Sequence, residues 1–592
     1  MKTRFTKGNW FFYLIFCLSL GLTWFFHKDS VKFNDRYELW GDRAGYYIYL
    51  PATFFYHFDA RKIPADLDQQ TGGGLSIDQQ KNKIETKYTC GVAILASPFF
   101  ITAGLISRVA GYDSEYGFSL LYIRMMALAA VVYLILGLWF LKKFLDHYFT
   151  PFISYFVVTF IFLGTNLFYY ALIDGMMSHV YSFFLFAVFL YSLKRYIDTR
   201  RYSFFIVLCI IFSLAILIRP TNILIGLLFF TLDAETASTW LTRFRNLLKP
   251  AYFLSFLAIL LLIFIPQMVY WKYLSGHWLH FSYTGEGFDN WRTPQVAGVL
   301  FSPVNGLIAY SPLVILFLAG LVIMIIKKKA NGWSIAAIFL AVTVICASWK
   351  MWYFGCSLGQ RSFIEYYTVL ALPFGYVTEK VFRTRKFLVT TILLFAVFLL
   401  TYFNLRYTIS LYRFDRCYYG STWDWDHYLR TVERAGIISP VHQMKSYEND
   451  FENLALSPVP HPSTVFTRSG QYSIAANTTG GITPLYTARL NDFGYPWPKM
   501  MDVDVWVLKP GALATGAVLG YTLSHGNEVL FGEEQPVDSL LQSPLTWSKI
   551  SKRFIIPDVN DSSLVVSVFV RNPLRSLFYV EDLKIQYKYK WN

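Results

Sequence analysis

Long apolar runs recur between residues 9 and 405, and they constrain the fold of this chain more than any other feature of its sequence. Several reach or exceed roughly 18 residues, the length at which a helix spans the hydrocarbon core of a bilayer. Only 15% of the 592 residues are charged and 55% are hydrophobic, whereas a soluble protein carries about 25% charged residues. The sequence therefore predicts a polytopic α-helical membrane protein and argues against a soluble multidomain fold.

Basic residues cluster in short segments between the apolar runs, and the net charge is +15. This clustering follows the positive-inside rule for cytoplasmic loops, so we expect no nucleic-acid partner. The first run has no small-residue cleavage site before His27, which indicates an uncleaved first helix with a cytoplasmic N-terminus. The cysteines form no CxxC motif or Cys/His cluster, so they predict neither a disulfide framework nor a zinc site.

The basic clusters also select one topology among the alternatives. About twelve runs are apolar enough to span, but a span at 90–109 would place every later basic cluster outside the cell. We therefore expect 90–109 to be re-entrant or to lie at the interface, within a large outer loop at 27–116. The remaining spans, about eleven, are predicted at 9–26, 118–141, 151–172, 177–193, 203–218, 221–232, 251–271, 306–326, 333–348, 362–378 and 387–405.

The chain changes character after the last predicted span. We divide it into a membrane domain at 1–406, a polar connector at 407–462 and a C-terminal domain at 463–592. Short alternating runs bounded by turn residues fill the last domain, which predicts an all-β sandwich or jelly roll on the outer face. The clearest strand candidates are 502–507, 564–570 and 577–587.

Carboxylates are the first candidate site residues. The outer loop holds Asp35, Glu38 and Asp42 in a segment that turns amphipathic and aromatic, as expected for a helix at the interface. A carboxylate just above the bilayer can deprotonate an acceptor hydroxyl or amine. The alternative is a solvated loop carboxylate paired with Arg36 or Arg43.

Three further candidates lie in or beside apolar runs. Arg124 is inside the run at 118–141, where a charge needs a partner such as Asp42 or Asp174, or an anionic ligand. His179 and Asp174 flank the turn after the next run. Histidine near a helix start is also common as a cap or a core group, and that alternative stays open.

Three cations lie near predicted outer helix ends, namely Arg219, Lys350 and Arg361. Arginine binds phosphate bidentately and lysine binds it as a point charge; snorkelling toward lipid headgroups is the alternative. Carboxylates, a histidine and cations on one face beside lipid suit a sugar attached to a lipid phosphate. The sequence contains no Gly-rich nucleotide loop, HExxH motif or GxSxG triad, and GGGLS at 72–76 is read as a loop.

Several segments resemble the GT-C membrane glycosyltransferases, the superfamily of protein O-mannosyltransferases and the aminoarabinose transferase of lipid A. GDRAGYYIYLPATFFYHFD is similar to the first-loop segment of bacterial members and places Asp42 at their acidic position. KYTCGVAILASPFF looks like their interface-lying segment, and YIRMMALAAVVYLILGLWFLKKF looks like their second helix, with Arg124 as its arginine. Further similar segments are MMSHVYSFF, GLIAYSPLVIL and WYFGCSLGQRSF. Many relatives carry two adjacent acidic residues, whereas Asp42 is followed by Arg43, which leaves open whether Asp35 or Glu38 takes part.

The resemblance covers about 1–405. It implies an inverting glycosyltransferase at the outer face of a bacterial inner membrane, with a polyprenyl-phosphate-linked sugar as donor and a glycan, lipid or protein as acceptor. Asp42 would be the general base. The residues that would contact the lipid phosphate or orient the base are Arg124, His179, Lys350 and Arg361, with Asp35, Glu38, Asp174 and Arg219 in support.

The resemblance leaves the cofactor and the role of the tail open. Some relatives use a divalent cation, but no ligand cluster in this sequence indicates one. WSKISKRFIIP and FYVEDLKIQYK resemble closing strands of carbohydrate-binding jelly rolls, and a domain that only packs over the active site is the alternative. Two other functions are alternatives. A transporter or flippase of lipid-linked glycan should show inverted repeats, and none is convincing here; a non-enzymatic glycan-binding surface protein would not need so many helices.

Overall fold

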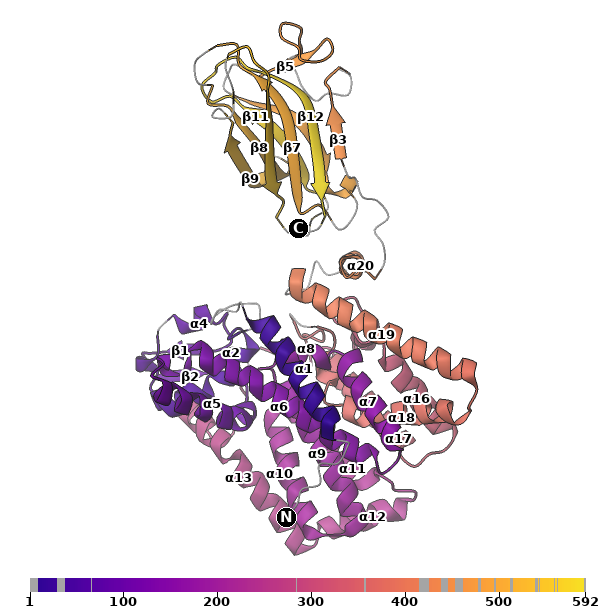
Figure 1. Ribbon diagram of the computed structural model, residues 1–592. Helices are drawn as coiled ribbons and strands as arrows, with labels where there is room; N and C mark the ends of the chain where they lie inside the picture. Colours follow the sequence, from indigo (N-terminus) through magenta and orange to yellow (C-terminus); the bar gives the residue numbers. More distant parts are fainter. Residues whose placement is uncertain are drawn as a thin grey trace. The chain divides into compact units, whose positions relative to one another are not determined.

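The chain divides into two compact units, Met1–Trp425 and Asp426–Asn592. The first unit is helical and the second is built from strands (Figure 1). The computed structural model describes residues 9–28, 38–64, 66–283, 285–355, 358–414, 425–437, 446–452, 462–476, 481–493, 497–511, 515–526, 528–537, 541, 544–557, 559, 561 and 563–589.

Long apolar helices form the body of the helical unit, and each predicted span coincides with helical structure. The long helices are α1 (Asn9–His27), α5 (Gly91–Ala110), α6 (Leu120–Leu145), α7 (Pro151–Gly164), α9 (Ser178–Thr199), α10 (Tyr202–Ile218), α13 (Pro250–Ser275), α16 (Val314–Ile326), α17 (Gly332–Ser348), α18 (Tyr367–Arg383) and α19 (Phe387–Phe414). The shorter ones are α2 (Asp42–Tyr47), α3 (Tyr49–Pro51), η1 (Ala52–Tyr56), η2 (Ala60–Lys62), α4 (Leu67–Gln70), η3 (Glu115–Gly117), α8 (Leu167–Leu172), η4 (Pro220–Gly226), α11 (Leu227–Thr231), α12 (Ala237–Leu247), α14 (Val296–Phe301), α15 (Leu307–Tyr310) and η5 (Arg361–Phe363).

By length and composition, six helices in the described part of the chain could cross a membrane, namely α1, α5, α6, α9, α13 and α19. Shorter apolar helices of 10–17 residues are α7, α10, η4 with α11, α16 and α17. The predicted polytopic helical fold is therefore confirmed. Helix α5 covers the segment that we expect to be re-entrant or interfacial, and its 20 residues are long and apolar enough to span.

The described part of the loop predicted at 27–116 folds into a compact structure. Its buried apolar residues on α2, α3, η1 and α5 share one core with residues of α6 and with Tyr270 of α13. Tyr270 and Tyr273 also hold the small hairpin of β1 (Ser76–Asp78) and β2 (Lys83–Glu85), because their hydroxyls accept from the amides of Thr86 at 2.9 Å and Ile84 at 3.1 Å. This packing fixes the loop that carries Asp42.

One predicted span is interrupted. The helix predicted at 151–172 stops at Gly164, and Thr165 and Asn166 form a break before α8. Both residues are fully buried, and the freed backbone finds side-chain partners: the amide of Asn166 donates to the hydroxyl of Ser311 at 3.0 Å. Such breaks are tolerated at membrane depth only where the protein itself satisfies the backbone.

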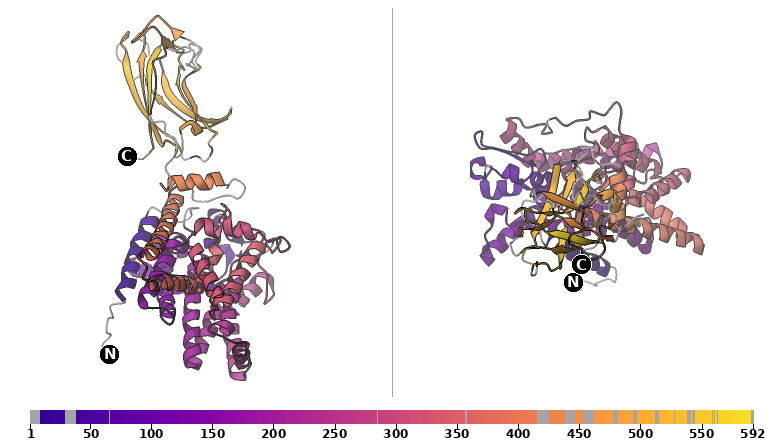
Figure 2. Two further views of the ribbon diagram at one scale, coloured as in Figure 1. Left: turned by 90° about the vertical axis from the view of Figure 1, so that its right-hand side faces the viewer. Right: turned by 90° about the horizontal axis from the view of Figure 1, so that it is seen from above.

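The second unit is an antiparallel sandwich whose two sheets enclose one apolar core (Figure 2). One sheet has the order β10-β7-β12-β5-β4, with β3 also paired to β12, and the other has the order β6-β11-β8-β9. The strands are β3 (Ser446–Asn449), β4 (Pro462–Ser463), β5 (Ser473–Ala475), β6 (Ile482–Arg489), β7 (Met500–Leu508), β8 (Val518–His525), β9 (Glu528–Pro536), β10 (Ser548–Ile555), β11 (Val565–Arg571) and β12 (Tyr579–Lys588). The three clearest strand predictions are thus confirmed as β7, β11 and β12.

The alternation predicted for β7 has a direct structural cause. Val503, Val505 and Val507 are buried in the core, whereas Asp502 and Asp504 lie on the opposite face of the strand, as the two-residue period requires. The predicted connector at 407–462 is partly structured. It contains the end of α19, because buried Tyr407 and Leu411 extend its apolar face, and also α20 (Trp425–Arg434) and β3.

Candidate functional site

Asp42 begins α2, and close packing of glycines fixes its position. The preceding Gly41 has φ 54° and ψ −129°, a conformation that favours glycine. Its amide donates to the carbonyl of Thr71 at 2.8 Å. A Cβ on Gly74 would collide with the Gly41 carbonyl. The GGGLS segment, which we read as a plain loop, is therefore the support on which the start of α2 rests.

A cation and a tyrosine hold the two carboxylate oxygens of Asp42. Arg361 donates from Nη2 to Oδ2 at 2.7 Å, and the hydroxyl of Tyr88 donates to Oδ1. Burial raises the pKa of the Asp42 carboxyl, but the charges of Arg361 and Lys87 and the hydrogen bonds from Tyr88 and Arg361 together bring it below 3.8. Asp42 is therefore ionised at neutral pH, and its side chain keeps 31% of its surface exposed.

Hydrogen bonds to the backbone just before Arg361 fix the position of this residue. Asn166, at the break between α7 and α8, donates to the carbonyl of Leu358 at 3.0 Å, and the Leu358 amide donates to the hydroxyl of Tyr170 at 3.1 Å. The next amide donates to Oδ1 of Asn305 at 3.1 Å. Three buried side chains from other parts of the fold thus fix the turn η5, on which Arg361 lies. The close pairing with Asp42 raises the pKa of the Arg361 guanidinium despite its burial, so that this cation stays charged.

A second buried polar cluster continues from the same turn. Arg219 donates to Oε1 of Glu365 at 3.2 Å, to the hydroxyl of Ser362 at 2.8 Å and to Nδ1 of His179 at 2.9 Å. The same Nδ1 of His179 lies 3.4 Å from Oε2 of Glu365, so the imidazole contacts both members of the ion pair. Glu365 is fully buried and His179 is 2% exposed. Sequence reasoning missed Glu365, although a lone acidic residue in SFIEYYTVL was a usable signal.

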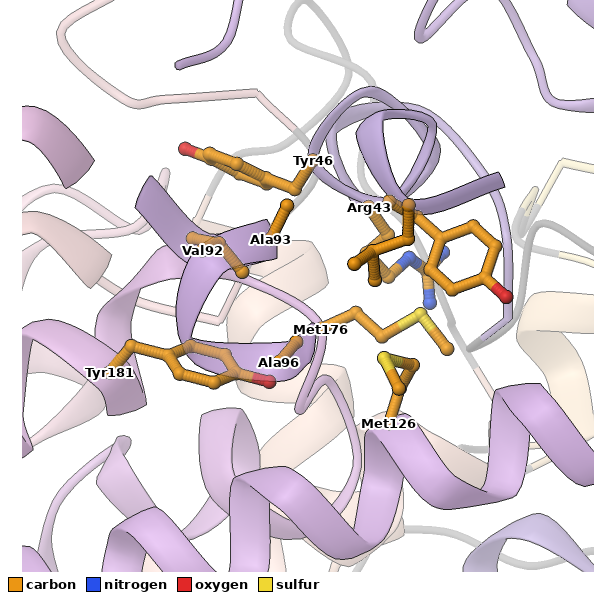
Figure 3. Close-up of a pocket in the computed structure, with 10 residues that line it drawn as sticks. Arg43, Tyr46, Val92, Ala93, Ala96, Met126, Met176 and Tyr181 are labelled. Carbon is orange, nitrogen blue, oxygen red and sulfur yellow. The ribbon is translucent and has the colours of Figure 1, made fainter. Parts of the chain in front are cut away.

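Asp174 pairs with Arg43 and not with Arg361 or Arg219. Nε of Arg43 lies 3.5 Å from Oδ1 of Asp174, and both side chains are largely buried. Burial raises the pKa of the Asp174 carboxyl above 3.8, although the charges of Arg43 and Arg361 oppose the change. Arg43 also lines a cavity of about 10 Å³, and Figure 3 shows its guanidinium pointing toward Met126 and Met176. This space admits about one water molecule and is too small for a sugar.

Lys87 adds a further cation that sequence reasoning missed. It forms an ion pair with Glu286, and its ammonium lies 5.5 Å and 5.6 Å from the ring centroids of Tyr88 and Tyr283. The carbonyl of Lys87 accepts from the hydroxyl of Ser282 at 2.8 Å. The loop after α13 is thereby tied to the residues beside Asp42.

The structure does not bring every predicted residue to this place. Arg124 is exposed on α6, and its guanidinium stacks on Trp24 of α1 at 5.1 Å instead of meeting Asp42 or Asp174. Those two carboxylates already have other arginines as partners. Lys350 is also exposed; it donates to the carbonyl of Gly285 at 3.1 Å.

Among the remaining predicted carboxylates, Glu38 is buried and pairs with Nδ1 of His27 at 3.1 Å, at the end of α1. Asp35 lies outside the described residues. In the described part of the chain no group of three or more His, Cys, Asp or Glu side chains is placed to hold a metal ion. Both oxygens of Asp42 have protein partners, Tyr88 and Arg361.

Comparison with known proteins finds structural similarity without sequence matches. No protein-family model matches the chain, and no curated protein matches it either. Among solved structures, ArnT from Cupriavidus metallidurans bound to undecaprenyl phosphate is 12% identical, with 73% of this chain and 70% of that chain covered and a TM-score of 0.44. The Archaeoglobus fulgidus oligosaccharyltransferase in the apo form is 11% identical, with 73% and 57% covered and a TM-score of 0.36.

A third neighbour is the CBM22-2 xylan-binding domain from Paenibacillus barcinonensis Xyn10C. It is 10% identical, with 24% of this chain and 99% of that domain covered and a TM-score of 0.18. These solved structures are of the two kinds that the sequence resembles, GT-C enzymes and a carbohydrate-binding module.

Proposed function

We propose that this chain is a membrane glycosyltransferase that moves a sugar from a polyprenyl-phosphate-linked donor to an acceptor hydroxyl or amine. The observation that carries the proposal is the pairing of Asp42 with Arg361 at 2.7 Å, together with a second largely buried arginine, Arg219. Ionised groups at the ends of apolar helices are costly to maintain. A base and phosphate-binding cations side by side are what this reaction needs.

In the proposed reaction Asp42 removes the proton from the acceptor while the acceptor oxygen or nitrogen bonds to the anomeric carbon of the sugar. The bond between that carbon and the phosphate oxygen breaks, and the polyprenyl phosphate leaves with the electron pair. Attack from the face opposite to the phosphate inverts the anomeric centre. Arg361, Lys87 and Arg219 are the cations that would stabilise the charge developing on the phosphate.

The Asp42–Arg361 pair would also link donor binding to base strength. A phosphate that binds Arg361 competes with Asp42 for the same guanidinium. When Arg361 turns to the phosphate, Asp42 loses the cation that contributes most to keeping its pKa low. The carboxylate becomes a stronger base only once the donor is in place, which suits general base catalysis near neutral pH.

His179 and Glu365 would position the guanidinium of Arg219. Glu365 holds the guanidinium through an ion pair at 3.2 Å, and His179 accepts from it at 2.9 Å. We place this chemistry at the outer face of a bacterial inner membrane, with the N-terminus in the cytoplasm and the strand-rich unit outside. The basic segments between apolar runs support that orientation. The acceptor class is a glycan, a lipid or a protein.

Sugar transfer by the full-length protein in lipid nanodiscs tests the proposal. Polyprenyl-phosphate [14C]mannose and polyprenyl-phosphate [14C]glucose serve as donor probes, and a bacterial envelope fraction supplies acceptors. Asp42→Asn should lower transfer by about 100-fold or more, the contribution of a general base. The matched control is Asp59→Asn, which removes another carboxylate of the same loop that pairs with an arginine, Arg61, at 2.8 Å. Full activity of Asp42→Asn would overturn the assignment.

A further inference from the structure

A second place in the helical unit is built for an apolar ligand. A cavity of about 260 Å³ lies between α9, α10, η4, α11, α12 and α13, and its wall is almost entirely apolar. Phe205, Leu208 and Phe212 line it from α10, and Phe229 and Leu247 line it from α11 and α12. Apolar cavities of about 150 Å³ already stay dry and accept hydrocarbon guests.

This cavity extends away from the site around Asp42, although Ile223 in its wall is only four residues after Arg219. Phe205 and Arg219 are at opposite ends of α10, and the 14 intervening steps of 1.5 Å place them roughly 21 Å apart along the helix axis. The cavity therefore adjoins the end of α10 that carries the basic segment at 200–201. A role in holding the sugar donor's phosphate at Asp42 does not explain it.

A cation is bound into the cavity wall. Arg243 lies one helical turn before Leu247 on α12, so both point to the same side. Its Nη1 donates to the carbonyl of Leu232 at 2.7 Å and to the carbonyls of Phe229 and Phe230 at 3.2 Å, and the two phenylalanines line the cavity. Its side chain is 4% exposed, and within the described residues its Nε has no hydrogen-bond partner. Burial and the charge of Arg200 lower the pKa of Arg243.

The surroundings of the cavity are those of a membrane interface. Helix α12 exposes Trp240, Leu241 and Phe244 next to basic side chains, the pattern of an amphipathic helix that lies among lipid headgroups. Exposed cations on the same segments form no ion pair with any described acidic residue: they are Arg200, Arg201, Arg245 and Lys249. The apolar cavity therefore lies on the same segments as exposed cations that form no ion pair with a described acidic residue.

We propose that this cavity binds a hydrocarbon chain of an anionic phospholipid, whose phosphate is held by Arg243 and Arg200, with the exposed Arg245 on the other side of α12 adding positive charge nearby. The apolar wall takes the chain, the amphipathic helix places the entrance at headgroup level, and the cations select negative charge. The site does not depend on the proposed sugar transfer. A bound lipid at this position would pack α12 and α13 against the rest of the helical unit.

Photo-crosslinking of the full-length protein in phosphatidylcholine nanodiscs tests the site. The probes are phosphatidylglycerol and phosphatidylcholine with the same diazirine-bearing acyl chain, and adducts are mapped by peptide mass spectrometry. We expect phosphatidylglycerol adducts in 205–212 and 226–230. The double variant Arg200→Ala, Arg245→Ala should reduce them by about fivefold for each arginine, with little effect on phosphatidylcholine adducts.

A substitution that fills the cavity provides an independent test of the site. Leu208→Trp should abolish these adducts, whereas Leu257→Trp, on the exposed side of α13, should leave them unchanged. The charge variants alter only exposed side chains, so they decide the question even if Leu208→Trp fails to fold. Equal labelling by the two probes, or adducts only outside the two segments, would overturn the proposal. So would displacement of phosphatidylglycerol by equimolar undecaprenyl phosphate, because a prenyl lipid would then be the occupant.

Discussion

Asp42→Asn should bind a polyprenyl phosphate more tightly than the unmodified protein while losing sugar transfer. In this structure Arg361 donates to Asp42 at 2.7 Å, so a phosphate that uses Arg361 must displace a carboxylate. A hydrogen bond to a charged group contributes about 1.5–3 kcal/mol. Because the Asp42 side chain is 31% exposed, we use the low end of this range. About 1.4 kcal/mol corresponds to tenfold in affinity.

The assay is a titration of undecaprenyl phosphate into the full-length protein in nanodiscs, followed by isothermal calorimetry at fixed ionic strength. We expect the Kd of Asp42→Asn to fall by about tenfold, and that of the control Asp59→Asn to stay unchanged. Arg361→Gln should weaken binding in both backgrounds. Unchanged or weaker binding by Asp42→Asn would show that the two groups do not compete, and the link between donor binding and base strength would be refuted.

Three more predictions follow from neighbouring features. Glu365→Gln leaves the guanidinium of Arg219 without its counter-charge, so the free energy of unfolding should fall by about 3 kcal/mol. KM for the donor should also rise by a larger factor than kcat falls. An unchanged KM would contradict the role of Glu365 in positioning Arg219. Gly74→Ala should destabilise the protein by about 2 kcal/mol and reduce sugar transfer, because a Cβ at this position would collide with the Gly41 carbonyl. The control is Gly73→Ala, whose Cβ would meet open space, so that it should cost only the strain of a positive φ. Thermal unfolding compares the stability of the two variants. Asp502 accepts hydrogen bonds from an arginine and a lysine, and the bond from the arginine does most to lower its pKa from 3.8 to about 2 in the folded protein. The contribution of Asp502 to the free energy of unfolding is therefore fully present above pH 3.8 and is lost as the pH falls toward 2. Screening of this part-exposed group limits that contribution to about 1 kcal/mol, and Asp502→Asn should therefore narrow the difference in unfolding free energy between pH 6 and pH 3.

Secondary structure was predictable because local pattern determines it. An apolar run such as 120–145 can satisfy its backbone in lipid only as a helix, and the two lysines at its end mark where it leaves the apolar region. The alternation in β7 similarly requires a strand with one buried face. The break at Thr165 and Asn166 was not predictable, because it depends on Ser311 and other residues far along the chain.

The candidate site was predictable only in part. Asp42, His179, Arg219 and Arg361 stood out because a charged or titratable group beside an apolar run needs a reason to be there. Their pairing did not follow from the sequence, since Asp42 and Arg361 are 319 residues apart. Lys87 and Tyr88 were missed because such residues are ordinary in a loop between apolar helices.

The sequence by itself determined which segments are helix and strand and which polar groups lie near the ends of apolar helices. Only the tertiary structure decided which of those groups meet. Arg124 shows the difference: its position in α6 was predicted correctly, but the rotation of α6 about its axis turns it to Trp24. Helix rotation is set by packing against neighbours rather than by the apolar run itself. For the same reason packing, and not local pattern, joined Glu365 to Arg219 and placed Asp42 against Arg361.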